Sequence, residues 1–133
     1  MSKEYQRRKN NKYQLPTEVY HMTLWMIRDY YRMTERLDEI LVESPSPPDG
    51  MPTGHNSQGE VISKVEKREE LKKKTLAIEE ALKTIPSEYA KGVWNNIQFR
   101  TAYPSDANRN TYGRWKAKFV YNVALNMKFI SKD

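Results

Sequence analysis

Residues 44–59, with the sequence SPSPPDGMPTGHNSQG, constrain the fold more than any other segment of the chain. They hold four of the seven prolines and three of the five glycines. Proline interrupts the hydrogen bonding of helices and central strands, and glycine adds conformational freedom, so no regular element is expected there. Helical periodicity is found on both sides. Residues 17–85 are therefore predicted to form a long helical hairpin with a Pro/Gly-rich loop at 44–59.

The first arm of this hairpin is predicted as one helix from Thr17 to about Glu43. Thr17 is suited to cap the helix, and Pro16 stops it from extending backwards. The apolar residues recur at steps of three and four, which is helical spacing. They are Val19, Met22, Met26, Tyr30, Met33, Leu37 and Ile40.

The second arm is predicted from about Glu60 to Thr84. Its apolar stripe is thinner, and the opposite face is rich in lysine and glutamate, as in one arm of an antiparallel helical pair. The stripe consists of Val61, Val65, Arg68, Leu71, Thr75, Ile78, Leu82 and Ile85. This pattern fits pairing of the long helices within one chain and pairing between two chains, so a homo-oligomer is one possible state.

Two shorter helices are predicted after Pro86, which breaks the chain. The first covers residues 87–98 and is followed by the irregular sequence FRTAYPSDANRN. The last helix is predicted to begin near Thr111, with Asn110 or Thr111 as its cap, and to end near Phe129. No segment shows the alternation of a strand with hairpin turns, so the predicted fold class is all-α.

Charge is distributed unevenly along the chain. The net charge is +6, but residues 17–85 contain ten basic and thirteen acidic groups. Residues 1–16 contain five basic groups and one acid, and residues 86–133 contain eight basic groups and three acids. Positive segments attract phosphate backbones and release counterions on binding. A basic flexible arm at 1–16, with Arg7, Arg8, Lys9 and Lys12, and a basic C-terminal part therefore favour nucleic acid as the partner.

Other features argue against catalysis and against a membrane role. The absence of cysteine excludes disulfides, thiol nucleophiles and iron–sulfur clusters, and His21 and His55 are too far apart in sequence for a usual histidine metal site. The sequence has no glycine-rich phosphate loop and no nucleophile elbow. No catalytic residue, metal or cofactor is predicted. No apolar run approaches about 18 residues, so a cytoplasmic protein is expected.

The last predicted helix combines an aromatic face with a basic one. Tyr112, Trp115 and Phe119 recur at steps of three and four, and Arg114 and Lys118 share another face. Such a helix can enter a DNA major groove, where arginine and asparagine reach base edges and lysine and threonine contact phosphates. The predicted DNA-binding residues are Arg109, Asn110, Thr111, Arg114, Lys116, Lys118 and Asn122.

A helix at 87–98, an irregular connection and a reading helix give residues 86–133 the order of a helix-turn-helix-like module. The motifs IPSEY, YP and TYGRWKAKFVYNVA lie within residues 77–127. Through them the chain resembles, over roughly residues 15–130, small phage- and prophage-encoded transcriptional regulators of Gram-positive bacteria. These are the RinA/ArpU-type late-gene activators, whose C-terminal half is similar to the fourth region of sigma factors.

This resemblance implies a regulator that activates phage packaging and structural genes in a bacterial host cell. Double-stranded DNA is the implied partner, and host RNA polymerase is a second candidate. The resemblance implies DNA contact by Asn110, Thr111, Arg114 and Lys118, and packing of the reading helix by Trp115, Phe119 and Val123. The chain departs from the family in the weakly formed middle helix of the motif, which bears on base readout more than on phosphate binding.

Two other functions fit the same sequence. A small terminase subunit also presents a helical DNA-binding module, but it assembles into rings. A helical adaptor without DNA binding would instead use the long hairpin to contact a protein, through the aromatic residues Trp25, Tyr30 and Tyr31.

Overall fold

The computed structural model describes residue 6, residues 11–43 and residues 57–131, with the backbone alone for residues 41–43 and 57–62. Within these ranges the chain forms helices and no strand, which confirms the predicted all-α class. The helices are α1 (Thr17–Arg28), α2 (Tyr30–Glu43), α3 (Ser57–Leu82), α4 (Ser87–Phe99) and α5 (Arg109–Asn126). Residues 44–56 of the predicted loop lie outside the described residues, and residues 57–59 begin α3.

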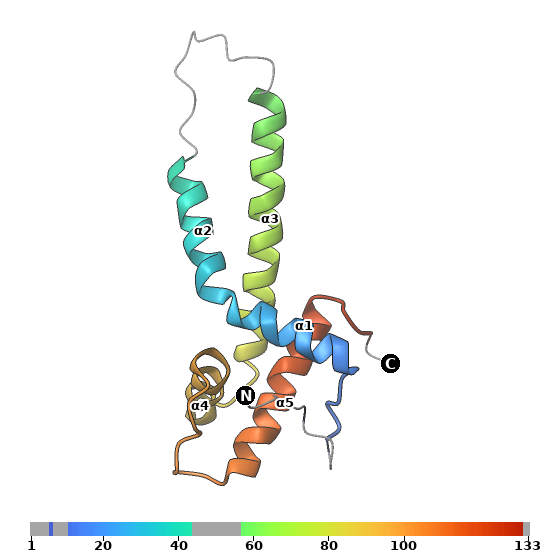
Figure 1. Cartoon of the computed structure of the whole chain (residues 1–133), viewed down its shortest axis with the longest axis vertical. Coiled ribbons are helices and arrows are strands. Elements are labelled where there is room, and N and C mark those ends of the chain that lie inside the picture. The colour runs from blue at the N-terminus through green and yellow to red at the C-terminus, as the bar shows by residue number, and fades with distance from the viewer. Residues whose placement is uncertain (1–5, 7–10, 44–56, 132–133) are drawn as a thin grey trace.

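The predicted single helix at 17–43 was wrong, because the chain bends at Asp29 into α1 and α2 (Figure 1). The N-cap of α1 is Pro16, and Thr17 makes no capping hydrogen bond. The bend has a physical reason in the buried residues. At about 100° per residue, the face of α1 that buries Leu24 and Ile27 is rotated by roughly 160° from the face of α2 that buries Met33 and Ile40. A straight helix could not bury both.

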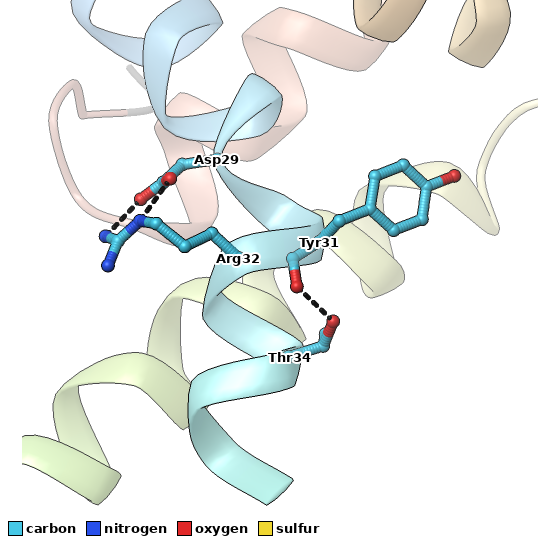
Figure 2. A network of polar contacts seen from close by, with 4 residues as sticks. All are labelled: Asp29, Tyr31, Arg32 and Thr34. Carbon is cyan, nitrogen blue, oxygen red and sulfur yellow. Dashed lines mark hydrogen bonds and ion pairs between the residues drawn. The ribbon is translucent and has the colours of Figure 1, made fainter. Parts of the chain in front are cut away.

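The bend keeps its hydrogen-bonding groups occupied. The Asp29 N–H donates to the carbonyls of Trp25 (3.2 Å) and Met26 (3.1 Å), and the Asp29 carbonyl accepts from the Met33 N–H at 2.9 Å. Figure 2 shows the Asp29 carboxylate accepting two hydrogen bonds of 2.6 Å from the Arg32 guanidinium. In the same view the Thr34 hydroxyl donates to the Tyr31 carbonyl at 2.9 Å. An acidic group at the start of α2 also suits the positive end of that helix.

Helices α2 and α3 lie side by side and are antiparallel: α2 leads away from the other three helices, and α3 leads back to them (Figure 1). Their contact is closest near the base, where Met33 and Ile78 are buried and the Tyr30 hydroxyl donates to a Glu79 carboxylate oxygen at 2.6 Å. Every residue of α3 from 63 to 70 is exposed, including Val65 at 53%. Among the described residues of the predicted apolar stripe, Val65 and Arg68 are therefore exposed, and burial begins at Leu71.

Helices α1, α4 and α5 pack against one another as a three-helix unit. Its core contains Leu24 and Ile27 from α1, Val93 and Ile97 from α4, and Phe119 from α5, all essentially inaccessible to solvent. The core therefore extends across the boundary predicted at residue 85, because helices on both sides of it pack together. Helix α1 belongs with the C-terminal helices, and the C-terminal part of α3 also joins them, because it packs on α5 and places Ile78 and Ala81 in the same core.

The C-terminal ends of α1 and α4 satisfy each other's last carbonyl groups. The Gln98 side chain donates from Nε2 to the Ile27 carbonyl at 2.6 Å. The Arg28 side chain donates from Nε to the Ile97 carbonyl at 2.8 Å. The last four carbonyls of a helix have no partner inside that helix, so these two side chains fix the ends of α1 and α4 against each other.

Tyr112 holds the connection at residues 100–108 against α5. Its ring is fully buried and stacks on Tyr103 with centroids 5.1 Å apart, and its hydroxyl donates to Asp106 Oδ1 at 2.6 Å. This connection contains turns but no helix. Helix α5 begins two residues earlier than predicted, because Asn108 is the cap and its side chain accepts from the Asn110 N–H at 2.8 Å. It ends at Asn126, three residues before the predicted end.

Candidate nucleic-acid interface

The outward face of α5 carries part of the predicted site. Tyr112, Phe119 and Val123 point into the core, and the three-helix unit therefore fixes the rotation of α5 about its axis. Arg109, Asn110 and Arg114 are exposed. The first turns of the helix thus present polar and cationic groups to solvent, as predicted from the helical spacing.

A cleft of about 500 Å³ adjoins this face and is called the basic–aromatic cleft below. Three segments line it: the chain before α1, the first turn of α4, and the N-terminal half of α5. The lining residues are Lys12, Tyr13, Tyr89, Thr111, Arg114, Trp115 and Lys118. Three cationic and three aromatic side chains therefore meet in one open concavity.

The three cations of the cleft make only weak contacts with the protein. Lys118 Nζ lies 5.3 Å from the centroid of the Trp115 ring, and Lys12 Nζ lies 5.4 Å from that of Tyr13. Arg114 Nε is 3.5 Å from the Asn110 carbonyl oxygen, at the limit of a hydrogen bond. In the described part of the chain, no carboxylate forms an ion pair with any of the three. Their positive field is therefore not neutralised locally.

Aromatic contacts hold the walls of the cleft in place. The rings of Tyr89 and Trp115 stack with centroids 6.0 Å apart and an interplanar angle of 18°. Tyr13 packs on Tyr121 of α5, with centroids 5.4 Å apart. Since ring pairs of this kind add to the free energy of burial, they join α4 and the N-terminal segment to the outer side of α5.

Two of the predicted DNA-binding residues are turned away from the cleft. Lys116 Nζ donates to Asn96 Oδ1 at 3.0 Å, and the amide of Asn96 donates in turn to the Thr101 carbonyl at 2.7 Å. The Asn122 amide donates to the Thr84 hydroxyl at 3.0 Å. Lys116 stands about 200° around the helix from Arg114, so one helical face cannot present both. The structure therefore brings together Thr111, Arg114 and Lys118, with Arg109 and Asn110 on the adjoining first turn.

Sequence reasoning placed Lys12 in a separate basic arm that favours nucleic acid, and it did not identify Tyr13 or Tyr89. Residues 1–16 were predicted to be a flexible arm, but Leu15 is only 3% exposed and its backbone forms hydrogen bonds with the side chain of Gln6. An apolar Leu15 just before the Pro16 helix start was the available signal that this segment packs on the body. Arg7, Arg8 and Lys9 lie outside the described residues.

The aromatic residues predicted for a protein contact have different environments. Trp25 is 65% exposed on α1. Tyr31 is half exposed, accepts a hydrogen bond from the Trp94 indole at 2.8 Å and stacks on Phe99. The Tyr30 hydroxyl is used by Glu79, and burial followed by this hydrogen bond raises the pKa of Tyr30 to about 12. Only Trp25 therefore projects outward without a ring or hydrogen-bond partner among the described residues.

The chain matches no family model, no curated protein and no solved structure. In the described ranges, no group of three or more histidine, cysteine, aspartate or glutamate side chains is placed to hold a metal ion. None of the described helices is both long enough and apolar enough to cross a membrane. In the basic–aromatic cleft, cationic side chains from separate segments converge.

Proposed function

We propose that this chain binds double-stranded DNA through the outer face of α5 and acts as a transcriptional regulator of the phage late-gene activator type. One observation carries the DNA-binding role: Lys12, Arg114 and Lys118 line one cleft, and no described carboxylate pairs with them. Duplex DNA carries one negative charge per about 1.7 Å of axis, so converging unpaired cations favour it over a neutral ligand.

The arrangement of helices supports α5 as the contacting element. It is the last helix of the α1–α4–α5 unit, and its first turns are exposed. The connection at residues 100–108 is longer than the three to four residues usual in a helix-turn-helix. We therefore assign phosphate contacts to the cleft residues, and base contacts to Arg109 and Asn110 on the exposed first turn.

The regulatory role rests on the family resemblance of residues 77–127. It places the protein in a bacterial host cell and adds host RNA polymerase as a second partner. Selection of bound duplexes from a random DNA pool tests this role, because a regulator enriches a defined sequence. Recovery of an unenriched pool would reduce the assignment to nonspecific DNA binding.

The DNA-binding role is tested by salt-dependent binding to a labelled duplex. For the wild type, the logarithm of the binding constant should fall linearly with the logarithm of the salt concentration. The double variant Arg114→Ala/Lys118→Ala should reduce the magnitude of this salt slope by about 2. A matched control is Lys72→Ala/Lys73→Ala, which removes two charges from exposed positions of α3. Equal salt slopes for the two double variants would mean that α5 does not contact the DNA.

Protein binding is a second candidate function, favoured by the side chains of Trp25 (65% exposed) and Met22 (48% exposed) on α1. These residues are three apart and therefore share a face that the other helices do not cover. If the protein is an adaptor, the wild type should bind no duplex at low salt. It should capture purified host RNA polymerase, and Trp25→Ala should abolish this capture. A small terminase subunit would instead bind DNA and show the mass of a ring of many subunits in solution.

A further inference from the structure

The segment just before α1 is tied to the protein body at several points. The Tyr13 N–H donates to Asn11 Oδ1 at 2.9 Å, which closes a turn around Lys12. The Tyr13 ring packs on Tyr121, and Leu15 is buried in the core. Lys12 is therefore held on the cleft wall that faces α5, and its ammonium group has a defined position relative to that helix.

The opposite wall of the cleft carries two further cations. Arg114 and Lys118 are four residues apart, so they stand one turn above the other on the same face of α5. Lys12, Arg114 and Lys118 line the same cleft from segments about 100 residues apart in sequence. A phosphate group offers several acceptor oxygens and can accept charge-assisted hydrogen bonds from donors on two sides.

The aromatic rings of the cleft are already used in packing within the protein. The Trp115 ring stacks on Tyr89 and lies under the Lys118 ammonium group, and Tyr13 packs on Tyr121. A nucleic-acid base that stacked in the cleft would compete with these contacts, whereas a phosphate needs only the cations. The cleft thus favours a backbone phosphate of a duplex over an unstacked base of a single strand.

We propose that the basic–aromatic cleft clamps one phosphate of the DNA backbone, with Lys12 on one side and Arg114 and Lys118 on the other. Tyr13 is the positioning residue, because its contact with Tyr121 keeps Lys12 over α5. This inference rests on the proposed DNA-binding function and deepens it, since it makes the N-terminal segment half of the contact.

The test is a salt titration of binding to a labelled duplex of random sequence, with the full chain and single variants. Lys12→Gln should lower the log–log salt slope by about 1 and the affinity about five- to tenfold at 0.1 M salt. Lys73→Gln on the exposed face of α3 is the matched control and should change neither quantity.

Tyr13 is tested in the same assay. Tyr13→Ala should lower the slope as much as Lys12→Gln does, and the double variant should lose no more than either single variant, because both act on one charge. Tyr13→Phe keeps the ring contact with Tyr121 and should retain the wild-type salt slope. A purely structural role for Tyr13 would lower thermal stability without changing the slope.

The possible outcomes separate the two proposals. If the wild type binds duplex and Arg114→Ala/Lys118→Ala weakens binding, but Lys12→Gln matches Lys73→Gln, the clamp is refuted and the DNA-binding role stands. If the wild type binds no duplex at low salt, both proposals fail. If a single strand of equal length binds more tightly than the duplex, the cleft is a stacking site and the phosphate clamp is refuted.

Discussion

Gly92 on α4 faces the ring of Tyr112 on α5 so closely that a Cβ at residue 92 would lie 2.6 Å from Tyr112 Cε1. It would also lie 2.9 Å from Pro104 Cδ. Neither neighbour can move easily, because Tyr112 is fully buried and bonded to Asp106, and proline is rigid. The crossing of α4 and α5, and with it the cleft between them, therefore depends on the absence of a side chain at residue 92.

Gly92→Ala should accordingly destabilise the protein. Alanine favours a helix over glycine by up to about 1 kcal/mol, but forcing a methyl group into a packed site costs about 1–3 kcal/mol. We expect the overpacking to dominate, with a net loss of about 1 kcal/mol or more in urea denaturation. Lys91→Ala, at the exposed neighbouring position, is the control and should be close to neutral. A stability gain in Gly92→Ala would contradict the close packing.

The exchange of hydrogen bonds between α1 and α4 gives a second prediction. Gln98→Ala leaves the Ile27 carbonyl without its side-chain donor and should cost about 1 kcal/mol. Gln98→Glu keeps the shape but replaces the donor with an anion near a carbonyl oxygen, so it should cost more than Gln98→Ala. Equilibrium denaturation at pH 7 measures both. Equal stability of the glutamate variant and the wild type would mean that this hydrogen bond does not contribute.

Alkaline pH should weaken the fold through two tyrosines. Burial, and then the hydrogen bond to Glu79, raise the pKa of Tyr30 to about 12. The hydrogen bond to Asp106, and then burial, raise the pKa of Tyr112 to about 12. Because both pKa values are above the unfolded value near 10, the folded state holds these protons more tightly. The contribution of these two tyrosines to the free energy of unfolding is fully present below pH 10 and is lost as the pH rises towards 12.

Urea denaturation at a series of pH values from 8 to about 11.5 measures this effect. The wild type should lose stability progressively above pH 10, and Tyr30→Phe and Tyr112→Phe should each show a shallower decline. Tyr31→Phe is a comparison at a more exposed ring. The assignment is refuted if the two buried-site variants decline as steeply as the wild type.

Much of the fold could be predicted from local patterns in the sequence. The three- and four-residue spacing predicted the helices, and the Pro/Gly-rich segment separated two of them. The bend at Asp29 was missed because Val19, Met22 and Met26 were read as one stripe with Met33, although Met22 is largely exposed. Leu24 and Ile27 form the true buried face of α1, and their rotation from Met33 was the signal of a break.

The cleft was harder to predict than the helices. Arg114 and Lys118 were identified from their spacing, which is a property of one helix. Lys12 and Tyr89 join them only because the fold brings three separate segments together, and no local pattern carries that information. Lys116 faces Asn96 instead of the cleft for the related reason that the packing partner of a helix decides which face is covered.

Lys116 and Lys118 provide the sharpest comparison, since they are two residues apart on α5 and carry the same charge. Lys116 is held by Asn96, and Lys118 lines the basic–aromatic cleft. Lys118→Gln should lower the salt slope of duplex binding by about 1. Lys116→Gln should leave the slope unchanged but destabilise the protein by about 1 kcal/mol, because Asn96 loses a donor. Salt titrations and denaturation of the two variants give both quantities, and an equal fall in slope would mean that DNA contacts α5 from the side of α4.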